Sequence, residues 1–112
     1  LPLCMNLEVL KRYMQQLISA KLLWKAQIMV TLAAFSSLEE ALQTKKNLPD
    51  SLIPDSILRK LGDSANPTQT GIEICNNMLR TIREIPGISG ANLLVLENPS
   101  TTVEAISQFQ SS

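Results

Sequence analysis

Apolar positions follow two patterns along the chain, and together these predict helices separated by short strands. Residues 7–20 and 67–85 carry apolar side chains at helical spacing. Residues 26–33 and 91–96 are instead short, nearly continuous apolar runs, which are typical of parallel strands covered on both faces. The chain is therefore predicted to consist of strand–helix units whose strands run parallel.

Polar residues mark the expected starts of the first helices. Asn6 is the expected N-cap of the helix over residues 7–20. Ser36 and Glu39 have the spacing of a capping box, which predicts a helix that continues to about residue 46.

Proline and glycine set the next boundaries. Pro54 is expected at the first position of a short helix that Gly62 closes. Asn66 and Pro67 are expected to open the long helix by the same device. The Pro86-Gly87 pair ends the long helix, because proline cannot continue it and glycine accepts a positive φ.

A final helix is expected after the polar residues 97–100. Thr101 and Glu104 have the spacing of a second capping box, and residues 110–112 are expected to be a frayed tail. The inward face of this helix is expected to carry Val103, Ile106 and Phe109.

The predicted order is a strand end over residues 1–5, then helix, strand, helix, short helix, long helix, strand and helix. This order is about two and a half βα units of an α/β fold. So small a parallel sheet does not cover its own faces and edges. We therefore expect residues 1–112 to be a single segment of a larger barrel or sheet, or to pack against a partner.

Charge and composition exclude several classes of function. The ten basic and ten acidic residues cancel, which argues against the basic face that nucleic-acid binding needs. No apolar stretch approaches the ~20 residues of a membrane span. The sequence contains no histidine, so it holds no His-based acid–base catalyst and no His-ligated metal.

The two cysteines are too few for a disulfide framework. This favours the cytoplasm or another reducing compartment, including an organelle if the N-terminus is processed. Cys75 lies on the apolar stripe of the long helix and is interpreted as a core residue, whereas the role of Cys4 stays open. Because the first residue is Leu1 rather than Met, we expect a processed, trimmed or partial chain.

Side chains that follow the ends of the predicted strands are the candidate ligand contacts, because α/β proteins bind ligands there. Glu97 and Asn98 follow the second strand, and Phe35 and Ser36 follow the first. Each has a structural alternative. Glu97 and Asn98 also suit a turn before proline, and Ser36 also suits a helix cap.

Three motifs in order resemble methylenetetrahydrofolate reductases. They are Ile53-Pro-Asp-Ser-Ile-Leu-Arg-Lys-Leu61, then Gly71-Ile-Glu-Ile-Cys75, then the run from Ile82 through Pro86-Gly87 to Asn92 that leads into a strand. The resemblance covers about residues 1–109. It implies the C-terminal third of a flavin-binding (β/α)8 barrel, with FAD or FMN as cofactor, a folate substrate, and a reduced nicotinamide or another electron donor. Other flavin or folate barrels of this type remain open.

The resemblance also implies particular substrate contacts, and this chain departs from several of them. Pro2 stands where the family often has a folate-binding glutamine, and residues 30–34 replace a Pro-Gly run. Leu38 stands where the family places an aromatic residue near the folate, although Phe35 is close enough to substitute. Most flavin-binding residues and the acid that activates the folate belong to the preceding part of such a barrel. The segment by itself is therefore expected to be inactive.

Three functional hypotheses follow. The first is part of a flavin-dependent methylenetetrahydrofolate reductase-like enzyme that works with the remainder of its barrel. The second is a non-catalytic, degenerate barrel fragment that acts as a structural or interaction subunit of a larger assembly. The third is an all-helical adaptor, in which residues 26–34 and 91–96 are helical.

Overall fold

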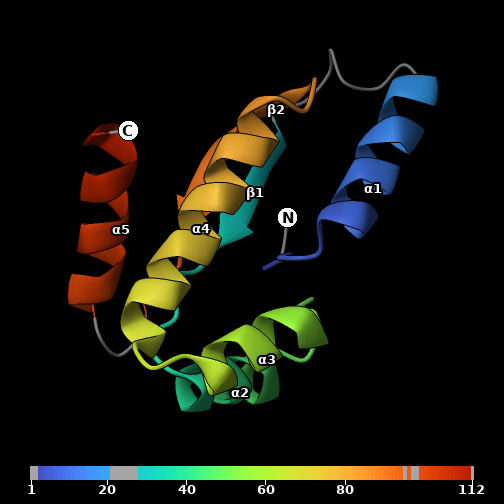
Figure 1. Ribbon diagram of the computed structural model, residues 1–112. Helices are drawn as coiled ribbons and strands as arrows, with labels where there is room; N and C mark the ends of the chain where they lie inside the picture. Colours follow the sequence, from blue (N-terminus) through green and yellow to red (C-terminus); the bar gives the residue numbers. More distant parts are fainter. Residues whose placement is uncertain (1–2, 21–27, 95, 97–98, 112) are drawn as a thin grey trace.

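The computed structural model describes residues 3–20, 28–94, 96 and 99–111. Five helices and two strands form an α/β fold in this part of the chain (Figure 1). This excludes the all-helical alternative. The elements are α1 (Leu7–Ser19), β1 (Ile28–Leu32), α2 (Leu38–Asn47), α3 (Asp55–Asp63), α4 (Pro67–Arg83), β2 (Ile88–Leu93) and α5 (Pro99–Ser111).

Strands β1 and β2 are parallel neighbours, as the apolar runs predicted. The Leu94 N–H extends the ladder by donating to the Leu32 carbonyl at 2.8 Å. On the other side of β1, Leu3 bridges Thr31 in parallel, and the Cys4 N–H donates to the Thr31 carbonyl at 3.2 Å. The predicted strand end is thus confirmed for Leu3 and Cys4, and three parallel segments follow one another in chain order.

The outer side of the Leu3–Cys4 segment is closed by the loop before α3. The Met5 N–H donates to the Leu52 carbonyl at 2.7 Å, and the Leu52 N–H donates to the Leu3 carbonyl at 2.9 Å. This edge of the sheet is therefore satisfied by the chain itself. Among the described residues, no strand pairs with the outer edge of β2.

The two faces of the sheet differ in polarity. Val30 and Leu32 are fully buried, and they pair with Ala91 and Leu93 of β2. The opposite face carries Met29, Thr31, Gly90 and Asn92, of which Asn92 is exposed. We call these four residues the open face. The apolar runs were predicted to be covered on both faces, and for β2 this was wrong, because none of its residues is fully buried.

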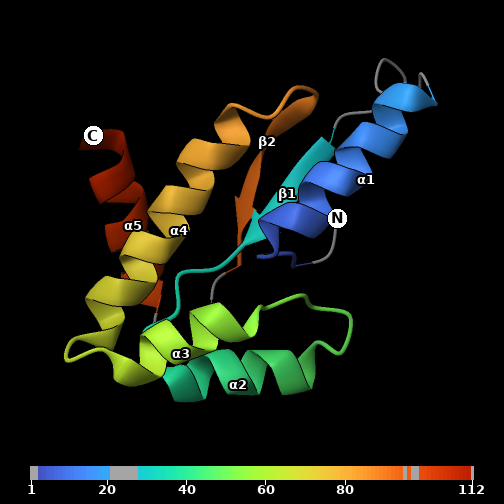
Figure 2. The same cartoon turned by 45° about the vertical axis from the view of Figure 1, so that its right-hand side comes forward.

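The helices lie mainly on the apolar side of the sheet and at one end of it. Figure 1 shows α4 in front of the two strands with α5 beside it, and Figure 2 shows α1 in front of β1. Helices α2 and α3 lie together beyond the end toward which the strands run (Figure 2). The main core joins α1, β1, α3 and α4 through buried side chains. They include Leu10, Met14, Val30, Leu32, Leu61, Met78 and Ile82.

Gly71 is the point of closest approach between α4 and the end of β1. A Cβ placed on Gly71 would lie 1.7 Å from the Phe35 carbonyl oxygen and 2.8 Å from the Phe35 carbonyl carbon. No side chain is compatible with backbone atoms at these distances. The helix and the loop after β1 pack this closely because residue 71 lacks a Cβ.

Several predicted boundaries were displaced. Strand β2 begins at Ile88 rather than at residue 91, directly after Gly87, whose φ is 92° as the turn prediction required. Pro54 is the N-cap of α3 rather than its first helical residue. Gly62 lies inside α3, which ends at Asp63.

Helix α5 was predicted with the wrong start and the wrong inward face. It begins at Pro99, so Thr101 is a helical residue rather than a cap, and the helix continues to Ser111 instead of fraying after residue 109. Val103 is 64% exposed, and Ile106 is exposed as well. The side chains buried on α5 are instead Thr101, Thr102 and Ala105.

Helix α5 packs against α4 at the small residue Ala105. Ala105 is buried against Ile72 and Cys75 of α4. Phe109, the third residue expected to face inward, is half-buried, and the Arg83 guanidinium lies 5.2 Å from its ring centroid. At that distance the cation interacts favourably with the face of the ring.

Replacing Gly71 by alanine is expected to destabilise the fold strongly. The new Cβ overlaps the backbone of Phe35, so α4 has to move away from the end of β1. We expect the free energy of unfolding, measured by urea denaturation, to fall by about 3 kcal/mol or more.

Gly62→Ala is the matched control, since Gly62 is also helical but its added Cβ meets only the end of the Leu38 side chain, at 3.2 Å. Its effect is expected to stay within about 1 kcal/mol. Equal losses in the two variants would contradict the packing described for Gly71.

Candidate functional site

The loop after β1 carries Ser36, one of the predicted ligand contacts, and its backbone is held on both sides. The Ser36 N–H donates to the Glu40 carboxylate at 2.9 Å. The Ser36 carbonyl accepts from the Thr68 hydroxyl of α4 at 3.1 Å. The segment after the strand is therefore fixed between α2 and α4.

The N-cap of α2 is Ser37, one residue later than predicted. The Ser37 hydroxyl accepts from the Glu40 N–H at 3.1 Å, while the Glu40 carboxylate reaches back to the Ser36 N–H. The capping box thus uses Ser37 and Glu40 instead of Ser36 and Glu39. As a result, the half-buried Ser36 hydroxyl forms no hydrogen bond within the described part of the chain and stays available for a ligand.

Phe35 and Leu38, the other two predicted contacts near Ser36, have different surroundings. Phe35 is 1% exposed and belongs to the main hydrophobic core. Leu38 is half-buried, and it lines a hollow between α2 and α3 that also contains Leu42 and Leu58. Leu38 also packs against this core, so Phe35 and Leu38 both serve the packing of the fold. Glu97 and Asn98 lie outside the described residues.

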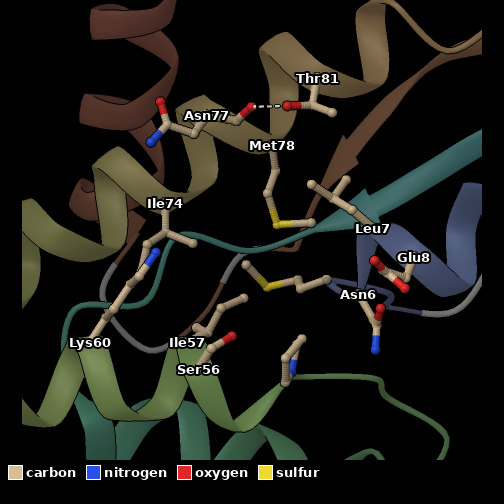
Figure 3. Close-up of a pocket in the computed structure, with 12 residues that line it drawn as sticks. Asn6, Leu7, Glu8, Ser56, Ile57, Lys60, Ile74, Asn77, Met78 and Thr81 are labelled. Atoms are coloured by element: carbon tan, nitrogen blue, oxygen red, sulfur yellow. Dashed lines mark hydrogen bonds between the residues drawn. The ribbon is translucent and has the colours of Figure 1, made fainter.

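A pocket of about 360 Å³ opens between α1, α3 and α4, with β1 behind it (Figure 3). We call it the three-helix pocket. It lies where the Leu3–Cys4 segment ends and α1 begins. The residues that line it are Met5, Asn6, Leu7, Glu8, Pro54, Ser56, Ile57, Lys60, Ile74, Asn77, Met78 and Thr81.

The innermost part of the three-helix pocket is apolar. Met5, Met78 and Ile57 are all buried, and Ile74 is half-buried. Thioether side chains adapt to irregular shapes, so two methionines make this part of the wall deformable.

Polar groups surround the apolar part of this pocket. The Asn6 side chain accepts from the Val9 N–H at 3.2 Å, which caps α1 and directs the amide NH₂ elsewhere. The Thr81 hydroxyl donates to the Asn77 carbonyl at 2.9 Å. Lys60 and Glu8 lie at opposite ends of the pocket in Figure 3.

The sequence patterns did not identify the three-helix pocket. Lys60 is a polar residue of a short helix, and Asn77 lies beside the apolar stripe of α4. Neither position shows a special pattern, because its neighbours in the pocket come from distant parts of the chain. The only signal was the resemblance motif Ile53–Leu61, which places Ser56, Ile57 and Lys60 on one short helix.

Cys75 is a core residue, as predicted. It is 0% exposed and packs with Ala34, Ile72 and Ala105. Burial raises the pKa of the Cys75 thiol from 9.0 to about 11, because the thiolate loses its hydration. The thiol is therefore neutral near pH 7 and unsuited to act as a nucleophile.

Neither a metal centre nor a membrane-spanning helix is present among the described residues. They contain no group of three or more His, Cys, Asp or Glu side chains that could hold a metal ion. None of the helices in the described ranges has both the length and the apolar character needed to cross a membrane.

Cys75 is expected to make stability depend on alkaline pH. Because its folded-state pKa is raised, its contribution is complete below pH 9.0 and is lost as the pH rises to about 11. Between these pH values, the free energy of unfolding of the natural chain should fall by on the order of 2 kcal/mol more than that of Cys75→Ala. Parallel pH curves for the two proteins would refute this assignment.

Substitution of the two serines should separate the cap from the free hydroxyl. Ser37→Ala is expected to lower the free energy of unfolding by about 1 kcal/mol, because the Glu40 N–H loses its acceptor. Ser36→Ala should change it by less than about 0.5 kcal/mol. Thermal denaturation of both variants measures these losses of stability. A larger loss in Ser36→Ala than in Ser37→Ala would indicate that Ser36 is the N-cap.

The sequence was also compared with known proteins. No protein-family model matches this chain, and no curated protein matches it.

Proposed function

We propose that the chain is a segment of a flavin-dependent oxidoreductase that resembles methylenetetrahydrofolate reductase. In this proposal the described sheet is part of the wall of a (β/α)8 barrel. The observation that carries the proposal is the combination of three consecutive parallel segments, helices on the apolar side and an open face with polar groups.

The position of the crossover helices favours a barrel wall over a doubly wound sheet. In a doubly wound sheet, the strand order reverses and the helices cover both faces. Here the segments Leu3–Cys4, β1 and β2 lie in chain order, although Leu52 bridges Cys4 in parallel at the outer edge and stands outside that order. Helices α1 and α4 lie on the side of Val30 and Leu32. A barrel requires this arrangement, because its helices form an outer ring and its strands face one another inside.

The three resemblance motifs have structural roles that support this assignment. The run Ile53–Leu61 includes most of α3, at the end of the sheet where barrel enzymes bind their substrates. Gly71 allows α4 to contact the Phe35 backbone. Gly87 adopts the positive φ that directs the chain from α4 into β2.

FAD and a folate are the cofactor and substrate that the resemblance implies. A flavin held by the rest of the barrel, once reduced by a nicotinamide or another electron donor, would supply the hydride that converts the methylene group of the folate to a methyl group. Thr31 and Asn92 are register partners on the open face, and the exposed Asn92 provides an amide toward the inside of the proposed barrel. The Ser36 hydroxyl lies just beyond the end of β1, on the substrate side.

These side chains fit a supporting role in ligand binding. The open face consists of Met29, Thr31, Gly90 and Asn92, and none of these residues is acidic. In the proposal, the acid that activates the folate is therefore supplied by another part of the barrel. The chain described here positions the ligand and closes the wall, and it requires the remainder of the barrel for activity.

The complete natural protein is expected to purify with a yellow flavin that denaturation releases. It should also reduce methylenetetrahydrofolate, or oxidise methyltetrahydrofolate with an artificial electron acceptor. Absorbance spectra and this activity assay measure both properties. A colourless protein that stays inactive when FAD is added would reject the proposal.

Asn92→Leu in that protein is expected to lower the amount of flavin bound per polypeptide, because an apolar side chain replaces an amide inside the proposed barrel. Asn47→Leu is the control, since Asn47 ends α2 and is exposed. Circular dichroism checks that both variants fold. Equal flavin content in the two variants would show that the Asn92 side chain does not contribute to flavin binding.

A non-catalytic structural subunit is the second candidate function. Two observations favour it: Phe35 is buried in the core, and no described strand pairs with the outer edge of β2. Phe35, which was proposed to replace the family's aromatic residue near the folate, is thus not accessible to a folate. The outer edge of β2 is suited to pairing with a strand of another protein. A flavin-free protein that purifies only within a larger complex would support this alternative.

A further inference from the structure

We propose that the three-helix pocket binds a small aliphatic monocarboxylate. The pocket opens between α1, α3 and α4 with β1 behind it, so it lies on the helix side of the sheet (Figure 3). The proposed flavin and folate contacts belong to the open face and to the loop after β1. The residues that line the pocket are not among those contacts, and this inference does not depend on the oxidoreductase assignment.

The inner wall selects an apolar body. Met5, Met78 and Ile57 are buried at the base, and Ile74 adds a further apolar surface. An alkyl chain placed here loses its contact with water and packs against deformable thioethers. The volume of about 360 Å³ is at the small end of the range for ligand pockets, which limits the ligand to a short chain.

Lys60 supplies the charge that selects a carboxylate. Figure 3 shows its side chain extending from α3 toward Ile74 of α4. Lys60 forms no ion pair with a described residue, so its ammonium group is available to a ligand. Ser56 and Asn77 line the same pocket and add neutral hydrogen-bonding groups. A charge-assisted hydrogen bond to Lys60 is stronger than a bond between neutral groups.

Glu8 sets the preference for a single carboxylate. It lies in the first turn of α1, where the helix dipole stabilises its negative charge, and at the opposite end of the pocket from Lys60. A second carboxylate at the far end of the ligand would be repelled by Glu8. The pocket should therefore prefer a monocarboxylate to a dicarboxylate of the same chain length.

Titration of the complete natural protein with hexanoate tests the proposal, with isotope-labelled methionine methyl groups observed by NMR. We expect saturable shifts at Met5 and Met78, which line the pocket, and none at Met29 on the open face. Hexanol and adipate should each bind about tenfold more weakly, because one lacks the charge and the other places a second charge near Glu8.

Two variants separate this site from general apolar binding. Lys60→Met keeps an unbranched side chain of similar length but removes its charge, and we expect hexanoate affinity to fall about tenfold. Lys46→Met is the control, because Lys46 is an exposed residue of α2 outside the pocket lining, and it should bind hexanoate normally.

The proposal is overturned if hexanoate leaves the Met5 and Met78 signals unchanged, or if Lys60→Met and the natural protein bind it equally. Glu8→Gln should raise adipate affinity toward that of hexanoate. Unchanged adipate affinity would show that Glu8 does not cause the preference for a monocarboxylate. None of these measurements depends on flavin content. A negative result in the hexanoate experiments therefore does not bear on the oxidoreductase proposal, which the flavin and activity measurements test.

Discussion

The close approach of α4 to the end of β1 is the constraint on which the rest of the structure depends. Gly71 packs against the Phe35 carbonyl with no room for a Cβ, and Thr68 hydrogen-bonds to the next carbonyl, that of Ser36. Together these contacts fix the start of α4 at the strand terminus. The position of α4 in turn sets the apolar side of the sheet, one wall of the three-helix pocket and the surface against which α5 packs. The absence of a Cβ at Gly71 therefore links the position of the loop after β1 to the positions of both candidate sites.

The asymmetry of the small sheet links the fold to the proposed function. One edge is satisfied by the Leu52 backbone, whereas β2 has no described partner on its outer side. One face is apolar and packs against helices, whereas the other carries Thr31 and Asn92. A parallel sheet is stable only when its faces and edges are covered. The open side of this structure is therefore where the remainder of a barrel, or another partner, is proposed to attach.

Sequence patterns predicted local structure well wherever the determining contacts are themselves local. The caps at Asn6 and Asn66 and the positive φ of Gly87 depend on residues within one turn, and the structure confirms all three. The α2 cap was displaced by one residue, because Ser36 and Ser37 satisfy the same local rule and contacts with α4 distinguish them. Helix α5 was oriented wrongly, because the small residue Ala105 packs against α4 while Val103 faces outward. Hydrophobicity alone does not reveal how closely two helices approach.

The amino-acid sequence by itself determined the α/β class, the parallel direction of the strands, the order of the elements and the burial of Cys75. These properties follow from apolar periodicity and from helix-end residues, which act over a few positions of the chain. Only the tertiary structure decided which face of the sheet is open, that Phe35 is inside the core, and that Lys60, Asn77 and Glu8 line one pocket. These properties depend on side chains that are distant in sequence and meet only after the helices have packed.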